Sequence, residues 1–596
     1  MSEIKREITL GELLRGMRRT SRNPRALIRG LGLLIKNKPG RKMSIGWMLR
    51  KQAARHGDRV AMRDANRSYT YTEFNARANR IASLLRDCGV KRGDSVALMM
   101  ENRVDLLLSA AGVVKLGAVG IMLNYNQRGD VLAHSLQITN PKAMIIGSEC
   151  AEGLGTVRDQ LPETLGEGCF WLADYDNQTP VEGFRNLEDA LAGASDAEPP
   201  ETDELTTSDG AFYVFTSGTT GMPKAAVMSH GRWLKALAGV GLTSLRMDVD
   251  DVFYCSLPLY HNNALTLSWS ACMGSGATLA IARKFSASRF WDDVHHYNAT
   301  AFVYIGELCR YLLNQPEKEE ERTHRIRVML GNGLRPELWT EFRQRFKIPH
   351  INEFYGASEC NLLFTNTYDQ EQSCGFTPYA YAIVDYDPET EDPVRDDNGR
   401  LRKVGRGEVG LLLSKISKFA PFDGYTSKEA SEKKLLRDAF KQGDCWFNTG
   451  DLVRDMGLKH IQFVDRLGDT FRWKGENVAT TEVEQAINSF KGIIESVVYG
   501  VEIPNAEGRA GMAAVTLDEG AEFDGEGLAR HLNEQLPGYA IPLYIRTRSG
   551  QETTSTFKYQ KTQLKKEAYD PEVVPEPLYQ ISEDGQRYER MDGKQG

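Results

Sequence analysis

Strand-like and helix-like segments alternate along the chain from residue 95, and this order constrains the fold more than any other feature of the sequence. Three short apolar segments alternate with two amphipathic ones, at residues 96–100, 106–115, 119–123, 128–137 and 143–146. Asn102 is placed to cap the first helix and Gly117 is placed to end it. A β–α–β–α–β order predicts a parallel sheet with helices on its faces.

The alternation continues to about residue 467 and then changes. More strand-like segments lie at residues 211–215, 252–257, 277–281, 301–305 and 327–330. Several end in Gly, Asn, Thr or Pro, and ligands of open α/β sheets bind beyond the carboxyl ends of strands. After residue 467 come a helix, two strands and a helix, at 481–489, 496–501, 513–517 and 528–535. We therefore predict an α/β protein with a large domain of layered α/β subdomains over residues 45–467 and a small α+β domain over residues 468–596.

Length and composition are those of a globular protein with more than one domain. Of the 596 residues, 41% are hydrophobic and 26% are charged. A net charge of -7 gives no support to a nucleic-acid partner. The nine Cys form no C-x-x-C pair, which argues against a disulfide framework or a structural zinc site and is typical of a reducing compartment. No signal-peptide pattern opens the chain, so we expect a cytoplasmic protein.

Residues 1–44 form a basic arm in a chain that is acidic overall. The first 51 residues hold fourteen Lys and Arg against three Glu, with Leu, Ile and Met threaded among the charges. One interpretation is peripheral contact with the inner face of the cell membrane, where each cation near an anionic surface contributes on the order of 1 kcal/mol. The other is a solvated arm, or a helix docked on an acidic patch of the same protein. The sequence leaves both open.

A loop rich in Gly, Ser and Thr lies between two strand-like segments. Its sequence is Thr216-Ser217-Gly218-Thr219-Thr220-Gly221-Met222-Pro223-Lys224. The glycines let backbone N–H groups approach a polyanion, the hydroxyl groups are donors and the Lys is a cation, as a triphosphate requires. A Walker A loop is excluded because Met222 and Pro223 separate Gly221 from Lys224, which no Ser or Thr follows. Since Pro removes a helical amide, we expect this loop to join two strands.

Further motifs follow this loop in a fixed order. They are Gly331-Asn332-Gly333-Leu334-Arg335-Pro336, Tyr355-Gly356-Ala357-Ser358-Glu359, Thr449-Gly450-Asp451, Asp465-Arg466 and Lys474-Gly475-Glu476-Asn477-Val478. Together with the glycine-rich loop they resemble the signature of the adenylate-forming superfamily, which includes acyl-CoA synthetases, peptide-synthetase adenylation domains and luciferases. The resemblance extends from about residue 45 to residue 566 and is specific for the reaction class.

The resemblance implies a site for ATP and Mg²⁺. The phosphates would be held by Thr216, Ser217, Gly218, Thr219, Thr220, Gly221 and Lys224, with Thr219 also catalytic. Adenine would lie against Gly331, Asn332 and Gly333 and against the motif that contains Tyr355, Gly356 and Ser358. Tyr355 would stack on adenine or be an ordinary core residue. Glu359 would hold Mg²⁺, a hard cation that prefers carboxylate oxygen. Asp451 would bind the ribose hydroxyl groups, and Arg466 would assist or only pair with a carboxylate.

The resemblance also implies a second step with coenzyme A, for which the small domain is mobile. Gly468 would lie in the hinge, where the wider superfamily often has Asp or Lys, and Lys474 and Gly475 would face the pantetheine channel. Lys558 would stabilise the first transition state. The usual Gly before this lysine is missing, so Lys561, Lys565 and Lys566 remain alternatives. His261 would lie near the acyl carboxylate or be a structural histidine.

The amino-acid sequences of residues 331–336, 352–359 and 465–478 resemble those of the fatty-acid transport protein, or very-long-chain acyl-CoA synthetase, branch of this superfamily. It implies a long aliphatic carboxylate, so we expect an ATP-dependent fatty acid:CoA ligase that uses Mg²⁺, with a fatty acid and CoA as partners. Three alternatives remain open. They are an acyl-AMP ligase that loads a carrier protein, a CoA ligase for a bulkier carboxylate such as a bile acid, and a membrane-associated fatty-acid uptake protein.

Overall fold

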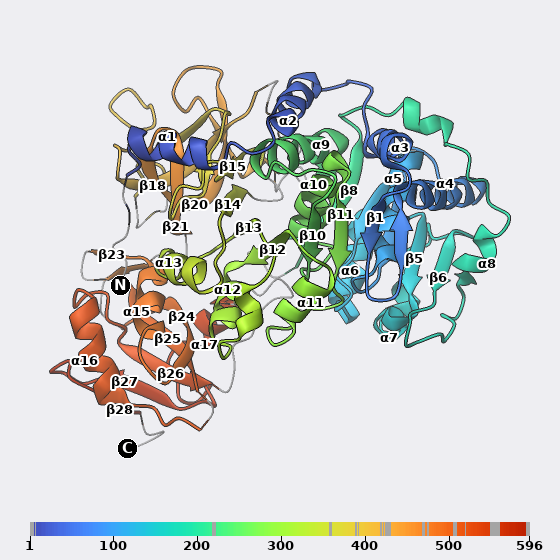
Figure 1. Ribbon diagram of the computed structural model, residues 1–596. Coiled ribbons are helices and arrows are strands. Elements are labelled where there is room, and N and C mark those ends of the chain that lie inside the picture. Colours follow the sequence, from blue (N-terminus) through green and yellow to red (C-terminus); the bar gives the residue numbers. More distant parts are fainter. Residues whose placement is uncertain are drawn as a thin grey trace. The chain divides into compact units, whose positions relative to one another are not determined.

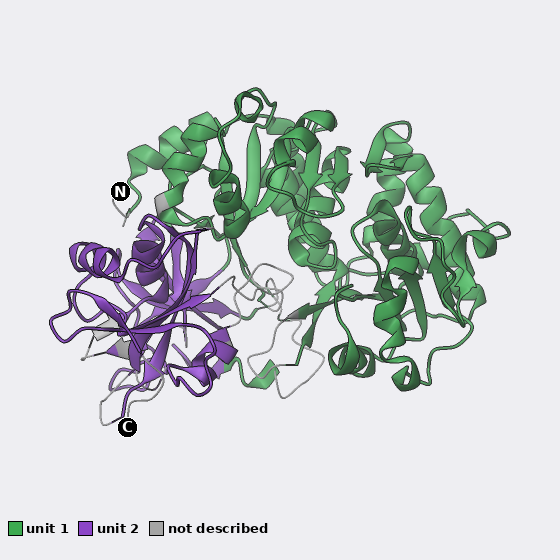
Figure 2. Ribbon diagram, turned by 90° about the horizontal axis from the view of Figure 1, so that it is seen from below, with its two compact units in different colours: residues 1–379, 416–435, 458–460 green, residues 380–415, 436–457, 461–596 purple. Residues whose placement is uncertain are grey.

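Residues far apart in the sequence come together in two compact units (Figure 2). One unit holds residues 1–379, 416–435 and 458–460, and the other holds residues 380–415, 436–457 and 461–596. The fold is that of a computed structural model, which describes residues 5, 7–216, 222–356, 360–387, 390, 392–417, 420, 422, 431–467, 471–473, 476–504, 509–518, 520–548 and 561–591. This division places residues 380–415 and 436–457 with the C-terminal part of the chain. The sequence-based domain boundary after residue 467 stays a prediction.

A parallel sheet in the first unit contains the predicted β–α–β–α–β order (Figure 1). It is formed by β3 (Ser95–Met99), α5 (Val104–Leu116), β4 (Val119–Met122), α6 (Gly129–Thr139) and β5 (Ala143–Gly147). The strand order is β7-β6-β5-β3-β4-β8-β9, and every neighbouring pair is parallel except β8 with β9. The other strands are β6 (Cys169–Leu172), β7 (Arg185–Asn186), β8 (Gly210–Thr216) and β9 (Lys224–Ser229). The predicted parallel sheet is confirmed.

The two ends of α5 differ in how well the sequence predicted them. Gly117 ends the helix with a φ of 83°, a left-handed conformation that Gly adopts without strain. Asn102 does not cap it. The first N–H of the helix, that of Val104, donates to the Asp64 carboxylate at 3.1 Å, and the Asn102 amide donates to the Leu257 carbonyl at 2.8 Å. Asn102 therefore makes a tertiary contact instead of capping the helix.

The second sheet of the first unit is parallel at its centre and antiparallel at its edges. Its strands within this unit run in the order β16-β15-β14-β13-β12-β10-β11-β1-β2. Neighbours from β14 to β1 are parallel, and the β14–β15, β15–β16 and β1–β2 pairs are antiparallel. The bounds are β1 (Val60–Arg63), β2 (Ser68–Thr70), β10 (Val252–Cys255), β11 (Thr278–Ile281), β12 (Ala301–Ile305), β13 (Val328–Asn332), β14 (Ile351–Gly356), β15 (Leu363–Thr365) and β16 (Gly375–Phe376).

Helices pack on these sheets and bury an apolar core. At its centre Trp269 packs edge-on against Trp233 and Phe74, with ring centroids 5.2 Å and 6.2 Å apart, a geometry favoured by aromatic quadrupoles. The α-helices are α3 (Ile45–His56), α4 (Tyr71–Asp87), α7 (Ala151–Gly155), α8 (Leu187–Leu191), α9 (His230–Ala236), α10 (Trp269–Ser275), α11 (Phe290–His296), α12 (Gly306–Leu313) and α13 (Pro336–Arg345). Short 3₁₀- or π-helices are η1 (Ser148–Cys150), η2 (Arg158–Gln160), η3 (Pro200–Asp203), η4 (Leu237–Ser244), η5 (Asn263–Ser268) and η6 (Glu319–Arg322).

The basic N-terminal segment forms two helices, α1 (Leu10–Arg19) and α2 (Pro24–Lys36), that dock on the first unit. Gly16 of α1 lies so close to a neighbouring backbone carbonyl group that a larger side chain would overlap it. Arg19 pairs with the buried Asp369 carboxylate at 2.7 Å. Docking on acidic groups of the same protein, one of the two interpretations, is therefore correct for one face of α1. Within the described residues, no helix is long and apolar enough to cross a membrane.

The second unit contains an antiparallel sheet and a smaller α+β body. β17 (Tyr381–Val384) pairs with β18 (Val409–Lys415), which pairs with β20 (Cys445–Gly457). In the α+β body the sheet order is β24-β25-β26-β27-β28. Its elements are α15 (Thr480–Asn488), β24 (Ile493–Glu502), β25 (Arg509–Leu517), α16 (Gly525–Gln535), β26 (Tyr544–Arg548), α17 (Lys561–Glu567), β27 (Leu578–Ile581) and β28 (Tyr588–Arg590). Further strands are β19 (Leu435–Arg437), β21 (His460–Arg466), β22 (Phe471–Trp473) and β23 (Glu476–Val478). The predicted α+β body is confirmed, and its mobility stays a prediction.

Candidate active site

Two of the predicted nucleotide-binding motifs lie at one edge of the second sheet. Gly331, Asn332 and Gly333 are at the carboxyl end of β13, and Tyr355 and Gly356 are at the carboxyl end of β14. The two strands are parallel neighbours, so these ends meet at the same edge. This edge is where ligands of α/β sheets bind, and the sequence motifs are brought together there as expected.

The loop after β13, residues 331–336, which we call the adenine loop, is shaped by its glycines and held by side chains. Gly333 has a φ of 82°, which favours Gly at this position. The Asn332 side-chain oxygen accepts a hydrogen bond of 2.9 Å from the Asn263 amide. Tyr355 is 7% exposed, and its ring packs edge-on against Phe364 at a centroid distance of 6.1 Å. Tyr355 therefore contributes to the core, and its stacking on adenine stays a prediction.

The phosphate loop is flanked by two strands, as the sequence predicted. β8 and β9 are antiparallel, with Thr216 opposite Lys224 in the register. The loop therefore closes a hairpin and does not open a helix, which agrees with the exclusion of a Walker A loop. Its ends bring the backbone of Thr216 beside that of Lys224, so a polyanion bound by the loop would have a cation at its base.

His261 lies in a turn that connects β10 to η5. Its backbone N–H donates to the Pro258 carbonyl at 3.1 Å, and its ring lies 4.4 Å from that of Tyr260. Two residues further on, Asn263 forms the hydrogen bond to Asn332 in the adenine loop. The predicted acyl-site segment therefore contacts the predicted adenine loop, and the role of His261 stays a prediction.

Asp451 and Arg466 lie together in the second unit. The Arg466 Nε is 3.5 Å from Asp451 Oδ1, and the Arg466 and Asp451 side chains are 56% and 10% exposed. A hydrogen bond of 2.8 Å from the Leu467 N–H to the Gly450 carbonyl holds their two segments side by side. Arg466 was expected either to assist ribose binding or only to pair with a carboxylate. Both are compatible with this ion pair, because Asp451 is itself the residue predicted to bind ribose. The pair would orient the Asp451 carboxylate toward hydroxyl donors.

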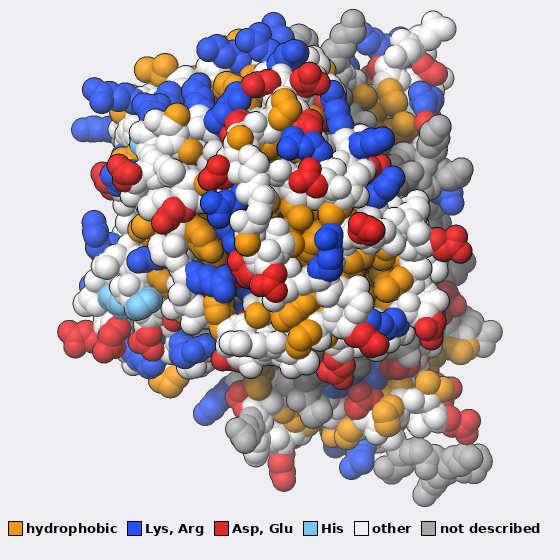
Figure 3. Space-filling model, turned by 90° about the vertical axis from the view of Figure 1, so that its right-hand side faces the viewer, with side chains coloured by type: hydrophobic (Ala, Val, Ile, Leu, Met, Phe, Trp, Pro, Cys, Tyr) orange, Lys and Arg blue, Asp and Glu red, His pale blue; other side chains and the backbone are white. Residues whose placement is uncertain are grey.

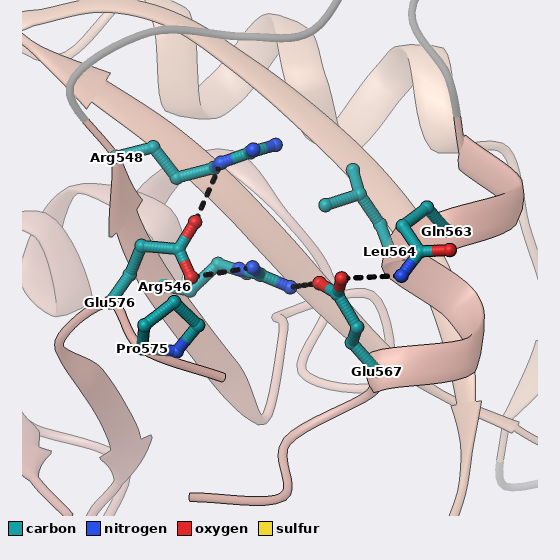
Figure 4. Close-up of a pocket in the computed structure, with 7 residues that line it drawn as sticks. All are labelled: Arg546, Arg548, Gln563, Leu564, Glu567, Pro575 and Glu576. Carbon is teal, nitrogen blue, oxygen red and sulfur yellow. Dashed lines mark hydrogen bonds and ion pairs between the residues drawn. The ribbon is translucent and has the colours of Figure 1, made fainter. Parts of the chain in front are cut away.

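Ion pairs around a pocket of about 200 Å³ join β26, the strand before residue 549, to α17 and to residue 576 (Figure 4). Arg546 of β26, whose side chain is 1% exposed, pairs with Glu567 of α17 at 2.8 Å and with Glu576 at 2.7 Å. Arg548 pairs with Glu576 at 2.9 Å. The pocket is lined by Arg546, Arg548, Gln563, Leu564, Glu567, Pro575 and Glu576. Because its Arg and Glu side chains pair with each other, we interpret it as a structural contact that holds β26 and α17 together, the two elements that precede and follow the segment with Lys558.

Lys561, an alternative to Lys558, is engaged by other side chains of the second unit. Its ammonium group donates to the Thr480 hydroxyl at 3.0 Å and lies 3.3 Å from the Glu484 carboxylate. Glu484 is itself buried and accepts a hydrogen bond from the Val498 N–H at 3.0 Å. This arrangement fixes the start of α17. Which of the lysines meets the substrate stays a prediction.

Several predicted site residues lie outside the residues that the structure describes. They are Ser217, Gly218, Thr219, Thr220, Gly221, Ser358, Glu359, Gly468, Lys474, Gly475 and Lys558. Their roles stay predictions. In the parts of the chain that are described, no three or more His, Cys, Asp or Glu side chains are grouped as metal ligands would be. The predicted Mg²⁺ ligand, Glu359, is not among those residues.

Sequence reasoning missed one residue at this site. Glu353 of β14 is 4% exposed, and its carboxyl group contacts the backbone of the adenine loop. Burial raises its pKa to about 8. No local pattern of the sequence marks Glu353, because its partners Gly333 and Tyr304 are distant in the sequence.

Comparison with protein families decides the class. A model of the AMP-binding enzyme family matches residues 49–415, and a model of the AMP-binding enzyme C-terminal domain matches residues 482–558. The chain belongs to the AMP-binding enzyme family. The medium/long-chain-fatty-acid–CoA ligase FadD6 of Mycobacterium tuberculosis is 47% identical over 96% of this chain and 94% of its own length. Long-chain fatty acid transport protein 6 of Mus musculus is 42% identical over 86% of this chain and 83% of its own length. The predicted superfamily and branch are confirmed.

Solved structures share the fold of this AMP-binding enzyme. ATP-bound MatB from Rhodopseudomonas palustris has a TM-score of 0.72 at 24% identity, over 89% of this chain and 100% of that one. The anthranilate CoA ligase AuaEII in complex with anthranoyl-AMP has a TM-score of 0.75 at 19% identity, over 88% of this chain and 97% of that one. The predicted fold class, a large N-terminal α/β domain with a smaller C-terminal α+β domain, is confirmed.

Proposed function

We propose that this protein is a fatty acid:CoA ligase that forms AMP and activates a medium- or long-chain fatty acid. The observation that carries the proposal is the 47% identity to FadD6 over 96% of this chain and 94% of that ligase. The match includes both regions of the AMP-binding family, so it spans the residues predicted for both steps of the reaction. ATP and coenzyme A are the co-substrates of this chemistry.

In the first step a carboxylate oxygen of the fatty acid attacks the α-phosphorus of ATP, and pyrophosphate leaves. Catalysis of this kind consists mostly of positioning and charge neutralisation. Lys224 and the hydroxyl groups of the loop over residues 216–221 would bind the β- and γ-phosphates, and Lys558 would stabilise the developing charge. Asp451, oriented by Arg466, would hold the ribose.

Mg²⁺ fits this site by the chemistry of its donors. Glu359 would hold the ion through a carboxylate, the hard ligand that Mg²⁺ prefers. Its segment follows β14, the strand whose carboxyl end lies beside the adenine loop. When bound, Mg²⁺ neutralises part of the triphosphate charge. Lys224, at the base of the phosphate loop, would neutralise a further part.

In the second step the thiol sulfur of CoA attacks the acyl carbon of the acyl-adenylate, AMP leaves, and a thioester results. Gly468 would act as the hinge about which the C-terminal domain moves between the steps, and Lys474 and Gly475 would face the pantetheine arm. The hinge is a short segment that follows β21, and such residues usually lie at the ends of elements.

ATP–pyrophosphate exchange tests the proposal. A panel of fatty acids from medium to very long chains, with a bile acid as the bulky competitor, is assayed with and without CoA. We expect exchange that requires a fatty acid and consumption of free CoA into a thioester. Exchange without CoA consumption would identify an acyl-AMP ligase for a carrier protein. Absence of exchange with every acid in the panel would overturn the proposal.

We further propose that α1 and α2 contact an anionic membrane surface. Their outer faces expose Leu10, Leu14, Met17, Ile28, Leu31 and Ile35, at exposed fractions of 43% to 71%. Exposed Arg and Lys side chains alternate with these apolar ones in both helices. Figure 3 shows Lys and Arg side chains gathered along the upper edge of the molecule with hydrophobic side chains among them, the edge at which Figure 1 places α2. This combination is typical of interfacial helices.

Sedimentation with vesicles tests the membrane contact. We expect the protein to pellet with phosphatidylglycerol vesicles, to be released by high salt, and to remain in solution after Leu14→Asp with Ile28→Asp. Val573→Asp is the matched control, since Val573 is an equally exposed apolar side chain, at 56%, outside the two helices. Equal loss of pelleting in the control, or pelleting that ignores lipid charge, would reject this contact.

A further inference from the structure

The adenine loop is held from its buried side by a carboxyl group. Glu353 Oε1 accepts hydrogen bonds from the N–H groups of Gly333, at 2.5 Å, and of Leu334, at 3.2 Å. Its second oxygen bonds the hydroxyl group of Tyr304, which is fully buried in β12. The three strands concerned, β12, β13 and β14, are consecutive parallel neighbours. One side chain therefore connects the loop to the strands on both sides of it.

These hydrogen bonds meet a specific need of the backbone. Beyond Asn332 the chain leaves β13 and turns through Gly333, so the next two N–H groups lie outside the strand ladder. A buried N–H group without an acceptor costs about 1–3 kcal/mol. Glu353 supplies the acceptor for the buried N–H of Leu334 and for the partly buried N–H of Gly333. The carboxyl group thus fixes the direction in which the loop leaves the sheet.

Close packing fixes the same turn from the other side. A side chain at Gly306 would overlap the carbonyl oxygen of Gly333, and a side chain at Gly331 would overlap the backbone and ring of Tyr304. The loop is therefore confined between Tyr304 with Gly306 on one side and Glu353 on the other. Its position is set before any ligand arrives, as preorganised binding requires.

The chemistry of the group is compatible with this role near neutral pH. Burial raises the pKa of Glu353 to about 8, so the carboxyl group is mostly protonated at neutral pH. A protonated carboxyl group can accept from two N–H groups through one oxygen and share a proton with the Tyr304 hydroxyl through the other. All of its hydrogen-bonding capacity toward the loop is then used without a buried net charge.

We propose that Glu353, held by Tyr304, is a positioning residue for the nucleotide, because it fixes the backbone of the adenine loop in the conformation that receives the purine ring. The proposal rests on the proposed function, in which residues 331–333 contact adenine. It makes the Tyr304–Glu353 pair part of ATP binding, although both side chains are buried within the sheet.

Steady-state kinetics of three variants test this role in the ATP–pyrophosphate exchange assay. Glu353→Leu removes the acceptor and should raise the KM for ATP about tenfold while the KM for the fatty acid stays within about twofold. Glu353→Gln keeps an acceptor oxygen for both N–H groups and an N–H₂ donor for Tyr304, so it should restore the KM for ATP to within about threefold. Tyr304→Phe leaves the loop contacts in place and should raise the KM for ATP about threefold.

Asn263→Ala is the matched control. It removes the 2.9 Å hydrogen bond to the Asn332 side chain but no contact with the loop backbone, so a smaller change in the KM for ATP is expected. The melting temperature of each variant is measured with and without ATP. A Glu353→Leu protein that melts lower but keeps its KM for ATP, or one in which both KM values rise equally, would overturn the positioning role.

Binding of ATP alone separates this proposal from the proposed function. If no fatty acid supports exchange in the wild type, but ATP raises the melting temperature of the wild type and not of Glu353→Leu, the proposed function fails and the positioning role stands. If fatty acids support exchange equally in both proteins, the ligase stands and the positioning role fails.

Discussion

The adenine loop and the lysine segment are supported in opposite ways. In the first unit, the adenine loop is held by backbone hydrogen bonds to one buried carboxyl group, that of Glu353. In the second unit, the elements before and after the segment that carries Lys558 are joined by charged side chains, in which Arg546 meets Glu567 and Glu576. A backbone contact fixes the conformation of a loop, whereas these ion pairs fix only the elements that precede and follow a segment.

This difference matches what each region is expected to do. The adenine loop must keep one shape for a rigid purine, and a buried hydrogen-bond network provides that shape. In the proposed function the lysine segment approaches ATP in one step and withdraws for the next, so support limited to the flanking elements suits a residue on a domain that is proposed to move. Variants in both regions test this contrast.

The largest effect concerns the pH dependence of stability. The pKa of Glu353 is about 8 in the folded protein, whereas the ordinary value for a Glu side chain is 4.5, so the unfolded chain loses its proton first as the pH rises. The folded state should therefore lose stability between about pH 4.5 and pH 8, by up to about 5 kcal/mol, and be unaffected by this group below that range. Glu353→Gln should remove this slope.

Denaturant unfolding of the wild type and Glu353→Gln at several pH values measures the effect. Tyr304 and Cys309, the titratable groups that face Glu353, have pKa values raised well above their ordinary range by burial, so neither titrates in this window. Parallel pH profiles for the two proteins would show that Glu353 is ionised in the folded state and would remove the contrast between a neutral and a charged support.

Lys558→Ala should have the second largest effect. We expect adenylation to fall about 100-fold or more, while thioester formation from preformed acyl-AMP changes less than about threefold, because the lysine acts in the first transition state only. Rapid-quench assays of the two half-reactions measure this. Lys491→Ala, a change of an exposed lysine between α15 and β24, is the control and should alter neither step. Equal loss of both steps in Lys558→Ala would remove the assignment.

Arg546→Met tests the anchor of the lysine segment. Glu567 and Glu576 would lose their buried cation, so local stability should fall by about 3 kcal/mol. Hydrogen exchange of the β26 and α17 amides measures this loss directly. Arg530→Met is the control, because its pair with Glu526 is 66% and 70% exposed and should contribute less than about 0.5 kcal/mol. Unchanged exchange in α17 would show that the ion pairs do not anchor the segment.

The smallest effect is expected for the ribose pair. Asp451→Asn should raise the KM for ATP about five- to tenfold through a weaker acceptor for the ribose hydroxyl groups. Arg466→Ala should raise it about threefold, since the arginine only orients the carboxylate 3.5 Å away. Exchange kinetics with ATP and with 2′-deoxy-ATP measure both. A wild-type preference for the ribose hydroxyl group that survives Asp451→Asn would place ribose recognition elsewhere.

Most of the architecture was predictable because it follows from local patterns. The buried strands β3, β4 and β5 are continuous apolar segments, and Gly117 ends α5 because only Gly adopts its left-handed backbone easily. The hairpin around the phosphate loop followed from the position of Pro223. Motifs at strand ends predicted the position of the adenine loop, because the carboxyl ends of parallel strands meet at one edge of a sheet.

Contacts between distant segments were not predictable from these patterns. Asn102 was expected to cap α5 but donates to the carbonyl of Leu257, just beyond β10, because a tertiary partner competes with local capping. Glu353 gave no signal, as its partners Tyr304 and Gly333 come from two other strands. The docking of α1 through Gly16 and Arg19 depends on surfaces formed by residues far along the chain. Such contacts exist only once the sheets are assembled.

The central claim is that a fatty-acid carboxylate attacks the α-phosphorus of ATP and that CoA then displaces AMP. It is tested most directly with a fatty acid labelled with ¹⁸O in both carboxylate oxygens. One labelled oxygen bridges carbon and phosphorus in the acyl-adenylate and leaves with AMP when the thioester forms. We predict AMP that carries one ¹⁸O and an acyl-CoA that retains the other. Label in inorganic phosphate with ADP as the product, or unlabelled AMP, would contradict the account.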